Sequence, residues 1–416
     1  MAAAGGNRAP HIVLLPSAGM GHLIPFSRLA AALSALGCDV SFVVVHPTVS
    51  AAETPRLDSS PPSPPSAIRL SAPQLITCVL NSSSSSSHSS NSSSPPVSAL
   101  VIDISLASAF IPVAAEFRLP SYILFHSSAP CSRSAPTFPR TRHRAGVIGD
   151  IDIPGVQTLR DLAAAGSSYP ALFTTQFVEN GGRSEGDGIV VNDVRRIERE
   201  ALAALNAGKC AGLPPRSPSA AAAPPLTLRL ARTARSPPLS WLDAQPRGRW
   251  STVVDRDEDE DEDEEDNSEL REVLERVKGR GMVVKGWVEQ AEVLGRESVG
   301  GFISHCGWNS VMEAAVSGTP VLAWPRHGDQ RVNAEVVRRC GLGIWEEEWS
   351  WEGENGVGVV VVKGEEIARC VRRLMDDEGV RASAARVGVA AKSAAAAAAE
   401  KDCVFGLPEF VRKLKV

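Results

Sequence analysis

The chain has 416 residues, which is too many for one ordinary hydrophobic core, so two domains are expected. Its formal net charge of -5 and sequence pI near 6.0 give no general attraction to nucleic acid or to an anionic membrane. The eight cysteines show neither a pairing pattern nor metal-ligand spacing, and no apolar run approaches the length of a membrane span. With no signal-peptide pattern in the first ten residues, these features predict a cytoplasmic protein that has no nucleic-acid partner and no membrane span.

The first predicted unit is a strand, a loop, a helix and a second strand. His11 to Pro16 is a short apolar strand, a helix with an apolar stripe follows and stops at Gly37, and residues 40–45 form the next strand. His22 lies on the loop or first helical turn, at the carboxyl end of the first strand. A histidine with an ordinary pKa of about 6.5 can remove a proton from a hydroxyl there. A helix-terminal histidine without a chemical role is the alternative reading of this segment.

The next predicted strand covers Leu100 to Ile102, with Asp103 at its end and a helix from Ser105 onward. Asp103 could orient a catalytic group, or it could simply cap the strand end, a common use of aspartate. Residues 54–96, by contrast, are poor in apolar residues and rich in serine and proline. We expect this insert to be disordered, because it cannot bury enough surface to offset the entropy of ordering it.

The rest of the first domain is predicted to contain strands at residues 122–126 and 188–192, followed by a helix at 197–205. Proline, serine and alanine then alternate over Pro214 to Pro225, which is typical of a linker. The expected division is a first domain over residues 1–212, a linker over 213–240 and a second domain over 241–416.

The polar residues of the second domain gather in two successive strand, loop and helix units between Trp287 and Gln330. Gly301 to Ser304 is a short strand, and a helix follows that ends at Gly318. A second strand over residues 319–324 leads to a helix over 329–339. A helix starting at Asn309 or Ser310 would direct unpaired backbone N–H groups and its positive dipole end at an anion, so a phosphate is the expected ligand.

This stretch resembles the nucleotide-sugar signature of the plant family 1 UDP-glycosyltransferases along its whole length. The match includes Gly-Gly-Phe-Ile-Ser-His-Cys-Gly-Trp-Asn-Ser and Thr-Pro-Val-Leu-Ala-Trp-Pro-Arg-His-Gly-Asp-Gln. The resemblance implies the α/β fold called GT-B, in which two Rossmann-like domains with parallel sheets face a central cleft. It also implies a monomer that uses UDP-glucose as donor substrate, a small-molecule acceptor, and neither a cofactor nor a metal.

The resemblance implies a donor site on the second domain. Trp287 would stack on the uracil ring through its flat π-face, with Val288 and Gln290 beside it. Glu313, one turn into the helix, would accept hydrogen bonds from the ribose hydroxyls. The other implied residues would hold the diphosphate (His305, Gly307, Asn309 and Ser310) or face the sugar (Trp308, Asp329 and Gln330). Packing explains each residue taken singly, so the hypothesis depends on their joint spacing.

The resemblance also implies a catalytic pair on the first domain, with His22 as general base and Asp103 as the carboxylate that orients the imidazole and stabilises its charged form. Several segments resemble the flavonoid C-glucosyltransferase branch: the Ala-Gly-Met-Gly-His loop, the Asp103-Ile104 pair, a Thr-Val-Val-Asp segment at 252–255 and a Trp-Ser-Trp-Glu-Gly segment at 349–353. They imply a polyphenol acceptor such as a 2-hydroxyflavanone, glucosylated at carbon with inversion.

The start of the second domain departs from the family pattern. Residues 247–254 pass directly into an acidic run over 255–266, which we expect to be solvated and disordered. We expect the first strand of this sheet and its phosphate-binding loop to be missing. Two alternatives follow: a degenerate UDP-sugar binder or truncated product without turnover, and a protein that binds basic partners through the acidic run. Phe410, Val411 and Leu414 predict a terminal helix that, in the family, crosses back to the first domain.

Overall fold

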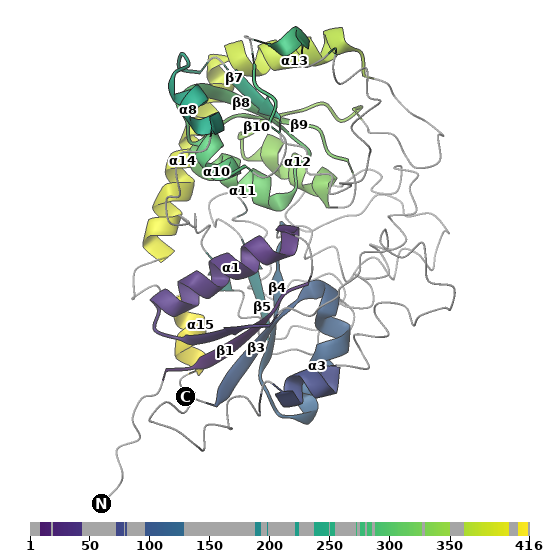
Figure 1. Ribbon diagram of the computed structural model, residues 1–416, viewed down its shortest axis with the longest axis vertical. Helices are drawn as coiled ribbons and strands as arrows, with labels where there is room; N and C mark the ends of the chain where they lie inside the picture. The colour runs from purple at the N-terminus through teal and green to yellow at the C-terminus, as the bar shows by residue number, and fades with distance from the viewer. Residues whose placement is uncertain are drawn as a thin grey trace, which may run out of the picture.

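The computed structural model of the protein contains two α/β units (Figure 1). It describes residues 9–17, 20–43, 72–78, 80, 96–128, 188–192, 198, 221–223, 237–248, 250–253, 272, 275–278, 281–284, 288–326, 329–349, 362–398 and 407–414. Among these residues, no helix combines the length and the apolar character needed to cross a bilayer.

The N-terminal unit is built on a six-stranded parallel sheet in the order β2-β1-β3-β4-β5-β6. The strands are β1 (His11–Leu15), β2 (Asp39–Phe42), β3 (Val97–Asp103), β4 (Ser121–Phe125), β5 (Gly188–Asn192) and β6 (Ala221–Ala223). The chain goes from β1 to β2 on one side and returns to β3 on the other. The point where the direction reverses therefore lies between β1 and β3, where ligands bind in open α/β sheets.

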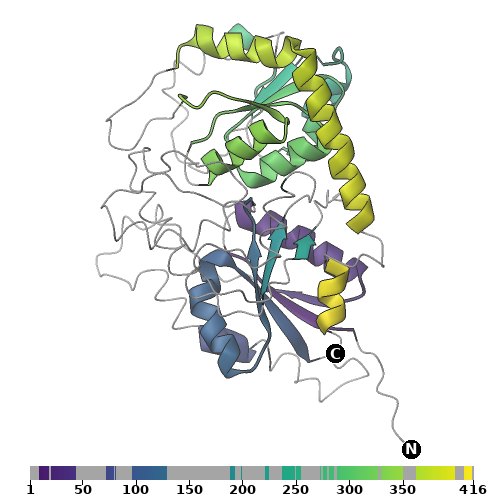
Figure 2. The same ribbon diagram turned by 180° about the vertical axis from the view of Figure 1, so that it is seen from behind.

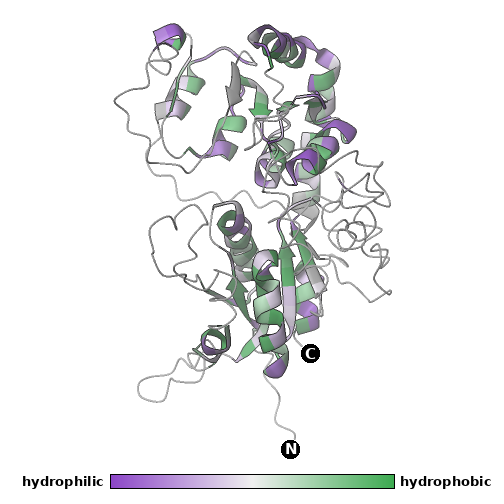
Figure 3. Cartoon of the chain, turned by 90° about the vertical axis from the view of Figure 1, so that its right-hand side faces the viewer, coloured by the Kyte–Doolittle hydropathy of each residue, from purple (hydrophilic) through white to green (hydrophobic). Residues whose placement is uncertain are grey.

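Alternate residues of the buried strands pack on opposite faces of this sheet. Ile12 and Leu14 lie in one core with α1 (Met20–Ala35) and α15 (Leu407–Leu414). Their neighbours Val13 and Leu15 lie in the other core, against the short 3-10 turn η2 (Ile104–Leu106) and α3 (Ala107–Glu116). The strands of this sheet are accordingly mostly hydrophobic along their length (Figure 3).

The C-terminal unit has a four-stranded parallel sheet in the order β10-β9-β8-β7. The strands are β7 (Trp250–Val253), β8 (Val299–Ser304), β9 (Val321–Ala323) and β10 (Gly343–Trp345). One core holds side chains of α8 (Pro237–Asp243), α10 (Gln290–Leu294), α11 (Trp308–Ser317), α12 (Gln330–Arg339) and α14 (Glu378–Ala398). A second core contains residues of α13 (Gly364–Asp376). The expected pair of parallel α/β sheets is thus present.

The prediction that the first strand of the C-terminal sheet is missing is wrong. Residues 250–253 form β7 and pair in parallel with β8, with Thr252 opposite Phe302 and Val253 opposite Ile303. The sequence Trp-Ser-Thr-Val is rich in aromatic and β-branched residues, which favour a strand. Its pairing satisfies the backbone groups along one edge of β8, which would otherwise lie unbonded. The acidic run at 255–266 lies outside the described residues.

Two other predicted boundaries differ from the structure. Strand β6 lies inside the range expected to be linker, and it pairs with β5 as the last strand of the N-terminal sheet. Within the serine-rich insert, residues 72–78 are helical, and Ala72 and Ile76 are buried in the core that also holds α3. Apart from Leu80, Pro96 and Glu198, the remainder of that insert and the predicted helix at 197–205 lie outside the described residues, as does most of the expected linker.

The terminal helix lies against the N-terminal sheet, as expected from its apolar residues. Figure 2 shows α14 extending from the C-terminal unit toward the N-terminal one and α15 beside the N-terminal sheet. The Phe410 ring packs edge-on against Tyr122 of β4, with ring centroids 4.8 Å apart. Leu407 and Val411 are buried in the same core. The C-terminal residues therefore form part of the first unit.

We predict that Phe410→Ala lowers the free energy of unfolding by about 3 kcal/mol, because it removes a buried aromatic ring and leaves a cavity in its place. Urea unfolding followed by circular dichroism measures the change. The matched control is Arg412→Ala on the same helix, which removes an exposed ion pair with Glu409 and should cost less than about 1 kcal/mol. Equal effects of the two substitutions would contradict the packing role of α15.

Candidate active site

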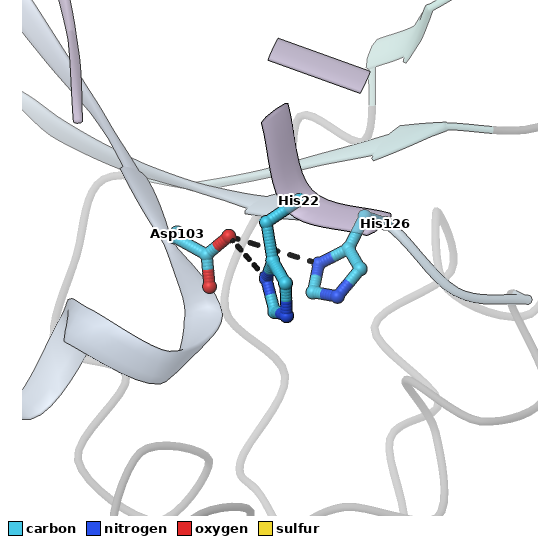
Figure 4. A group of neighbouring side chains, drawn as sticks. All are labelled: His22, Asp103 and His126. Atoms are coloured by element: carbon cyan, nitrogen blue, oxygen red, sulfur yellow. Dashed lines mark hydrogen bonds and ion pairs between the residues drawn. The ribbon is translucent and has the colours of Figure 1, made fainter. Parts of the chain in front are cut away.

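Three polar side chains meet at the carboxyl ends of three neighbouring strands (Figure 4). His22 lies in the first turn of α1, which follows β1, Asp103 is the last residue of β3, and His126 comes directly after β4. Because the strands are parallel and adjacent, their carboxyl ends bring these residues together at the reversal point of the sheet. The structure therefore joins His22 and Asp103, the two residues that the sequence predicts as a catalytic pair.

The Asp103 carboxylate is fully buried and held by hydrogen bonds on both oxygens. Its Oδ1 accepts from the backbone N–H of Ser105 at 2.9 Å and from the Ser105 hydroxyl at 2.7 Å. Its Oδ2 lies 2.9 Å from His22 Nδ1. Because a carboxylate can only accept, Nδ1 of His22 carries the proton of this bond. In the neutral imidazole, Nε2 then holds the lone pair that a general base requires.

Burial and charge act in opposite directions on this pair. Burial by itself would lower the pKa of His22, but the charge of Asp103, its hydrogen bond and the more distant charge of Asp329 raise that pKa above its ordinary value. Burial would likewise raise the pKa of Asp103, but the two histidines and the bonds from His22 and Ser105 hold it far below its usual range. The carboxylate stays ionised near neutral pH and stabilises the imidazolium form of His22.

His126 is a site residue that the sequence reasoning missed, since it appeared only as the end of a predicted strand. Its ring centroid lies 4.2 Å from that of His22. Burial, followed by the neighbouring charge of His22, lowers the pKa of His126 to about 4, so it is neutral near pH 7. The signal that could have identified it is its position directly after β4, the strand beside the one that ends in Asp103.

The turn between β8 and α11 leads into the N-terminus of that helix. Cys306 has a positive φ of 66°, and its backbone N–H donates to the Ser304 hydroxyl at 3.0 Å. At Gly307, which precedes the helix, a Cβ would lie only 2.5 Å from Nε2 of His305, so a larger residue would displace that ring. The helix begins at Trp308, one residue earlier than the expected start, and no described side chain caps it. Its first backbone N–H groups therefore point outward, ready for an anion.

Three of the predicted donor-site residues are hydrogen-bonded to one another. Gln290 Nε2 donates to the Ser310 hydroxyl at 3.1 Å and to Oε2 of Glu313 at 2.7 Å. The other Glu313 oxygen accepts from Arg28, which comes from α1 of the N-terminal unit. All four side chains are buried. Arg28 could not be singled out from the sequence, because its partner lies in the other unit.

Asp329 and Gln330 lie at the start of α12. Asp329 Oδ2 accepts from the Ser127 hydroxyl, next to His126, and from Asn333 Nδ2 at 3.1 Å. Its charge also raises the pKa of His22, so the carboxylate predicted to face the sugar lies near the predicted base. Gln330 Oε1 accepts from the backbone N–H of Arg326 at 2.8 Å, which shapes the loop before the helix.

The first residues of α11 contact the N-terminal unit directly. The Trp308 indole N–H donates to the backbone carbonyl of Asn192 at the end of β5, at 2.6 Å. Asn309 Nδ2 donates to the carbonyl of Gly21, the neighbour of His22, at 3.1 Å. The helix N-terminus and the predicted base thus lie next to each other. The Trp308 ring is buried against the end of β5, so its predicted contact with a sugar stays a prediction.

The other predicted residues are placed only in part. Trp287 lies outside the described residues, so its stacking role stays a prediction. Val288 is half-buried beside Gln290, and His305 is half-buried beside Gly307. Taken together, the described residues put the predicted general base beside a helix end whose geometry suits an anionic leaving group.

Comparison with known proteins agrees with this chemistry. The family model described as UDP-glucoronosyl and UDP-glucosyl transferase matches residues 272–349. The UDP-glycosyltransferase CGT of Oryza sativa subsp. indica is 42% identical, with 98% of this chain and 96% of the relative covered. UDP-glycosyltransferase 708A6 of Zea mays is 39% identical, with 100% of this chain and 99% of the relative covered. The crystal structure of LpCGTa in complex with UDP is 37% identical, with a TM-score of 0.73 and 98% of each chain covered.

The alignment with the rice relative extends over 473 residues, whereas this chain has 416. Segments of that relative therefore have no counterpart here. The described site residues are all present in this chain, and they meet in the structure.

We predict that Asp103→Asn lowers the pKa of His22. The neutral amide removes the opposing charge, so burial dominates and disfavours the imidazolium. Titration of the imidazole resonances by NMR measures this change. In the unchanged protein His22 should titrate above its ordinary value, so the stability gained from its protonated form is present at low pH and is lost as the pH rises through that raised pKa. An unaltered His22 pKa in Asp103→Asn would contradict the pairing.

Proposed function

The chain belongs to the plant family 1 UDP-glycosyltransferases, and from this premise we propose that it transfers glucose from UDP-glucose to a small polyphenol. It is a transferase of GT-B fold, which confirms the expected fold class. Its family uses a UDP-sugar donor and requires no cofactor. The observation that carries the proposal is the His22 and Asp103 pair beside the N-terminus of α11.

Our proposal for the donor starts from that helix end. The diphosphate accepts hydrogen bonds from the N-terminal backbone N–H groups, where the helix dipole favours negative charge. The ribose hydroxyls bond to Glu313, which Gln290 already orients. Trp287 stacks on the uracil ring, and Asp329 and Gln330 bond to the hydroxyls of the sugar. The complex of LpCGTa with UDP supports a uridine nucleotide, and glucose is our assignment for the sugar.

We assign the chemical step to His22. Nε2 removes a proton from a phenolic hydroxyl of the acceptor, and the Asp103 carboxylate stabilises the imidazolium that results. The acceptor attacks the anomeric carbon of the sugar from the face opposite UDP. One bond forms to that carbon while its bond to the diphosphate oxygen breaks, so the product is a β-linked glucoside with inverted configuration. The helix N-terminus stabilises the negative charge that develops on UDP.

We propose a carbon atom of the acceptor as the nucleophile. Removing the phenolic proton spreads negative charge onto the neighbouring ring carbons, so the same base serves attack through carbon. The proton on the attacked ring carbon then moves to the phenolic oxygen, which restores the aromatic ring. Relatives from rice and the LpCGTa structure carry CGT in their names, and the sequence resembles the flavonoid C-glucosyltransferase branch. A 2-hydroxyflavanone or a related polyphenol is the acceptor class that we propose.

The alternative of a degenerate relative without turnover rested on a missing strand and a missing phosphate-binding loop, and the residues that follow β7 lie outside the described part of the chain. Strand β7 is present, and the candidate base keeps its carboxylate partner, so nothing in the described residues favours that alternative. The acidic run lies outside the described residues, so its binding of basic partners stays a hypothesis. No disulfide joins any of the five cysteines in the described part of the chain, which supports our assignment to the reducing cytoplasm. A monomer remains our prediction.

We predict that His22→Ala lowers kcat by about 10²-fold to 10⁴-fold, because general base catalysis is lost. Turnover of UDP-glucose with a polyphenol acceptor, followed by liquid chromatography, measures the effect. UDP binding, measured by calorimetry, should stay unchanged, since no donor group is removed. Retention of full turnover in His22→Ala would remove His22 from the mechanism, and loss of UDP binding would point to a misfolded variant.

We predict that the product resists acid hydrolysis, because a carbon-linked glucoside has no acid-labile glycosidic oxygen. The purified protein is incubated with UDP-glucose and a panel of polyphenols, and each product is heated in acid and analysed by mass spectrometry. Products that all release glucose would be O-glucosides and would contradict the carbon-linked assignment while leaving UDP-dependent transfer intact.

A further inference from the structure

The cluster of His22, Asp103 and His126 has the ligand set of a metal site. Each residue offers one nitrogen or oxygen atom, and these atoms lie within 4.8 Å of one another. Imidazole nitrogen and carboxylate oxygen bind Zn²⁺ at about 2.0 to 2.2 Å. Two ligands of a tetrahedral ion with such bonds are therefore about 3.3 Å apart. The observed separations of 2.9 Å and 3.9 Å, from Asp103 Oδ2 to the Nδ1 atoms of His22 and His126, lie on either side of that value.

His126 provides an independent sign of a ligand. Its Nδ1 is buried and has no hydrogen-bond partner among the described residues, although it points toward Asp103 Oδ2 (Figure 4). At 3.9 Å that contact is too long for a hydrogen bond, and a buried polar nitrogen without a partner is costly. A cation between the two atoms would bond to the nitrogen lone pair and to the carboxylate at once.

The surroundings of the cluster suit a divalent cation. Ser105 fixes Oδ1 of Asp103 with two hydrogen bonds and so keeps Oδ2 turned toward both imidazoles. Hydrogen bonds of this kind commonly orient carboxylate ligands at metal sites. The nearby charge of Asp329 adds to that of Asp103. The side chains of His22 and His126 are 31% and 21% exposed, whereas Asp103 and the Nδ1 atom of His126 are buried, so the site lies just below the surface.

We propose that His22, Asp103 and His126 bind one Zn²⁺ ion and that the bound ion switches off the base. The ion binds Nδ1 of His22 in place of the proton that this atom shares with Asp103. The neutral imidazole must then carry its proton on Nε2, so it has no lone pair with which to deprotonate an acceptor. An imidazolium would instead release one proton to solvent as the ion binds. Water fills the fourth position of the ion.

The ligand set also selects among metals. Two imidazoles and one carboxylate favour Zn²⁺ and other late transition metals, whereas Mg²⁺ and Ca²⁺ prefer oxygen ligands. The ion binds to the residues of the free enzyme, so binding itself does not depend on the proposed function. Only the inhibition rests on the role assigned to His22.

Co²⁺ replaces Zn²⁺ as a visible probe in the test, with the full chain and no substrates present. We expect one Co²⁺ per chain, with the visible absorption of a tetrahedral site, and displacement of Co²⁺ by Zn²⁺. His126→Phe keeps a ring of similar size beside His22 but removes a ligand, so the affinity for Co²⁺ should fall at least tenfold. The matched control is Cys78→Ser, which removes an exposed thiol and should leave the binding unchanged.

The same samples test the consequence for turnover. Glucosyl transfer should fall in proportion to the Zn²⁺ bound and return when a chelator removes the ion. Absence of a tetrahedral Co²⁺ spectrum, or equal affinity in His126→Phe and the unchanged protein, would overturn the site. If His126→Phe fails to fold, judged by its melting temperature, His126→Gln provides the same comparison. A protein that binds Co²⁺ but transfers no sugar even when it is free of metal would retain the site and refute the proposed function alone.

Discussion

The structure of the active site depends on one buried charge. Asp103 is fully enclosed, and an ionised carboxylate is stable in such surroundings only when hydrogen bonds and opposite charge compensate for the lost water. Those partners come from the turn after β3 and from the helix after β1. Because Asp103 is hydrogen-bonded to both His22 and Ser105, it holds the carboxyl ends of β1 and β3 in place at the reversal point of the sheet. The orientation of His22 follows directly from this requirement.

The residues assigned to the donor are also the residues that join the two units. Trp308 and Asn309, at the start of α11, donate to backbone carbonyls of the N-terminal sheet and its first helix. Asp329 accepts from Ser127, which follows β4. The C-terminal helix α15 adds a hydrophobic contact with the N-terminal sheet at a distance from the site. The alignment of the two sheets and the arrangement of the site are therefore set by the same side chains.

The sequence predicts much of this site because its signals are local. His22 and Asp103 each lie at the carboxyl end of a strand, and Gln290, Ser310 and Glu313 lie within one continuous motif. His126, Arg28 and Ser127 escaped prediction because their roles arise from contacts between segments far apart in the chain. The strand β7 was judged missing because residues 247–254 pass directly into the acidic run without the loop and helix of the family pattern, and a short strand becomes evident only when its neighbour β8 is seen to pair with it. Residues such as Trp287, outside the described part of the chain, remain untested.

The contacts of Glu313 have a consequence for the strength of nucleotide binding. Arg28 holds one of its oxygens and Gln290 the other, while each oxygen retains a second lone pair. The side chain has already lost its rotational freedom when the protein folds, so a ribose bound there, as we propose, would not have to immobilise it. Immobilising such a side chain on binding costs about 0.5 to 1.5 kcal/mol. The entropy cost of ordering Glu313 therefore falls on folding rather than on the proposed nucleotide binding, and Arg28, which comes from the opposite unit, is part of the reason.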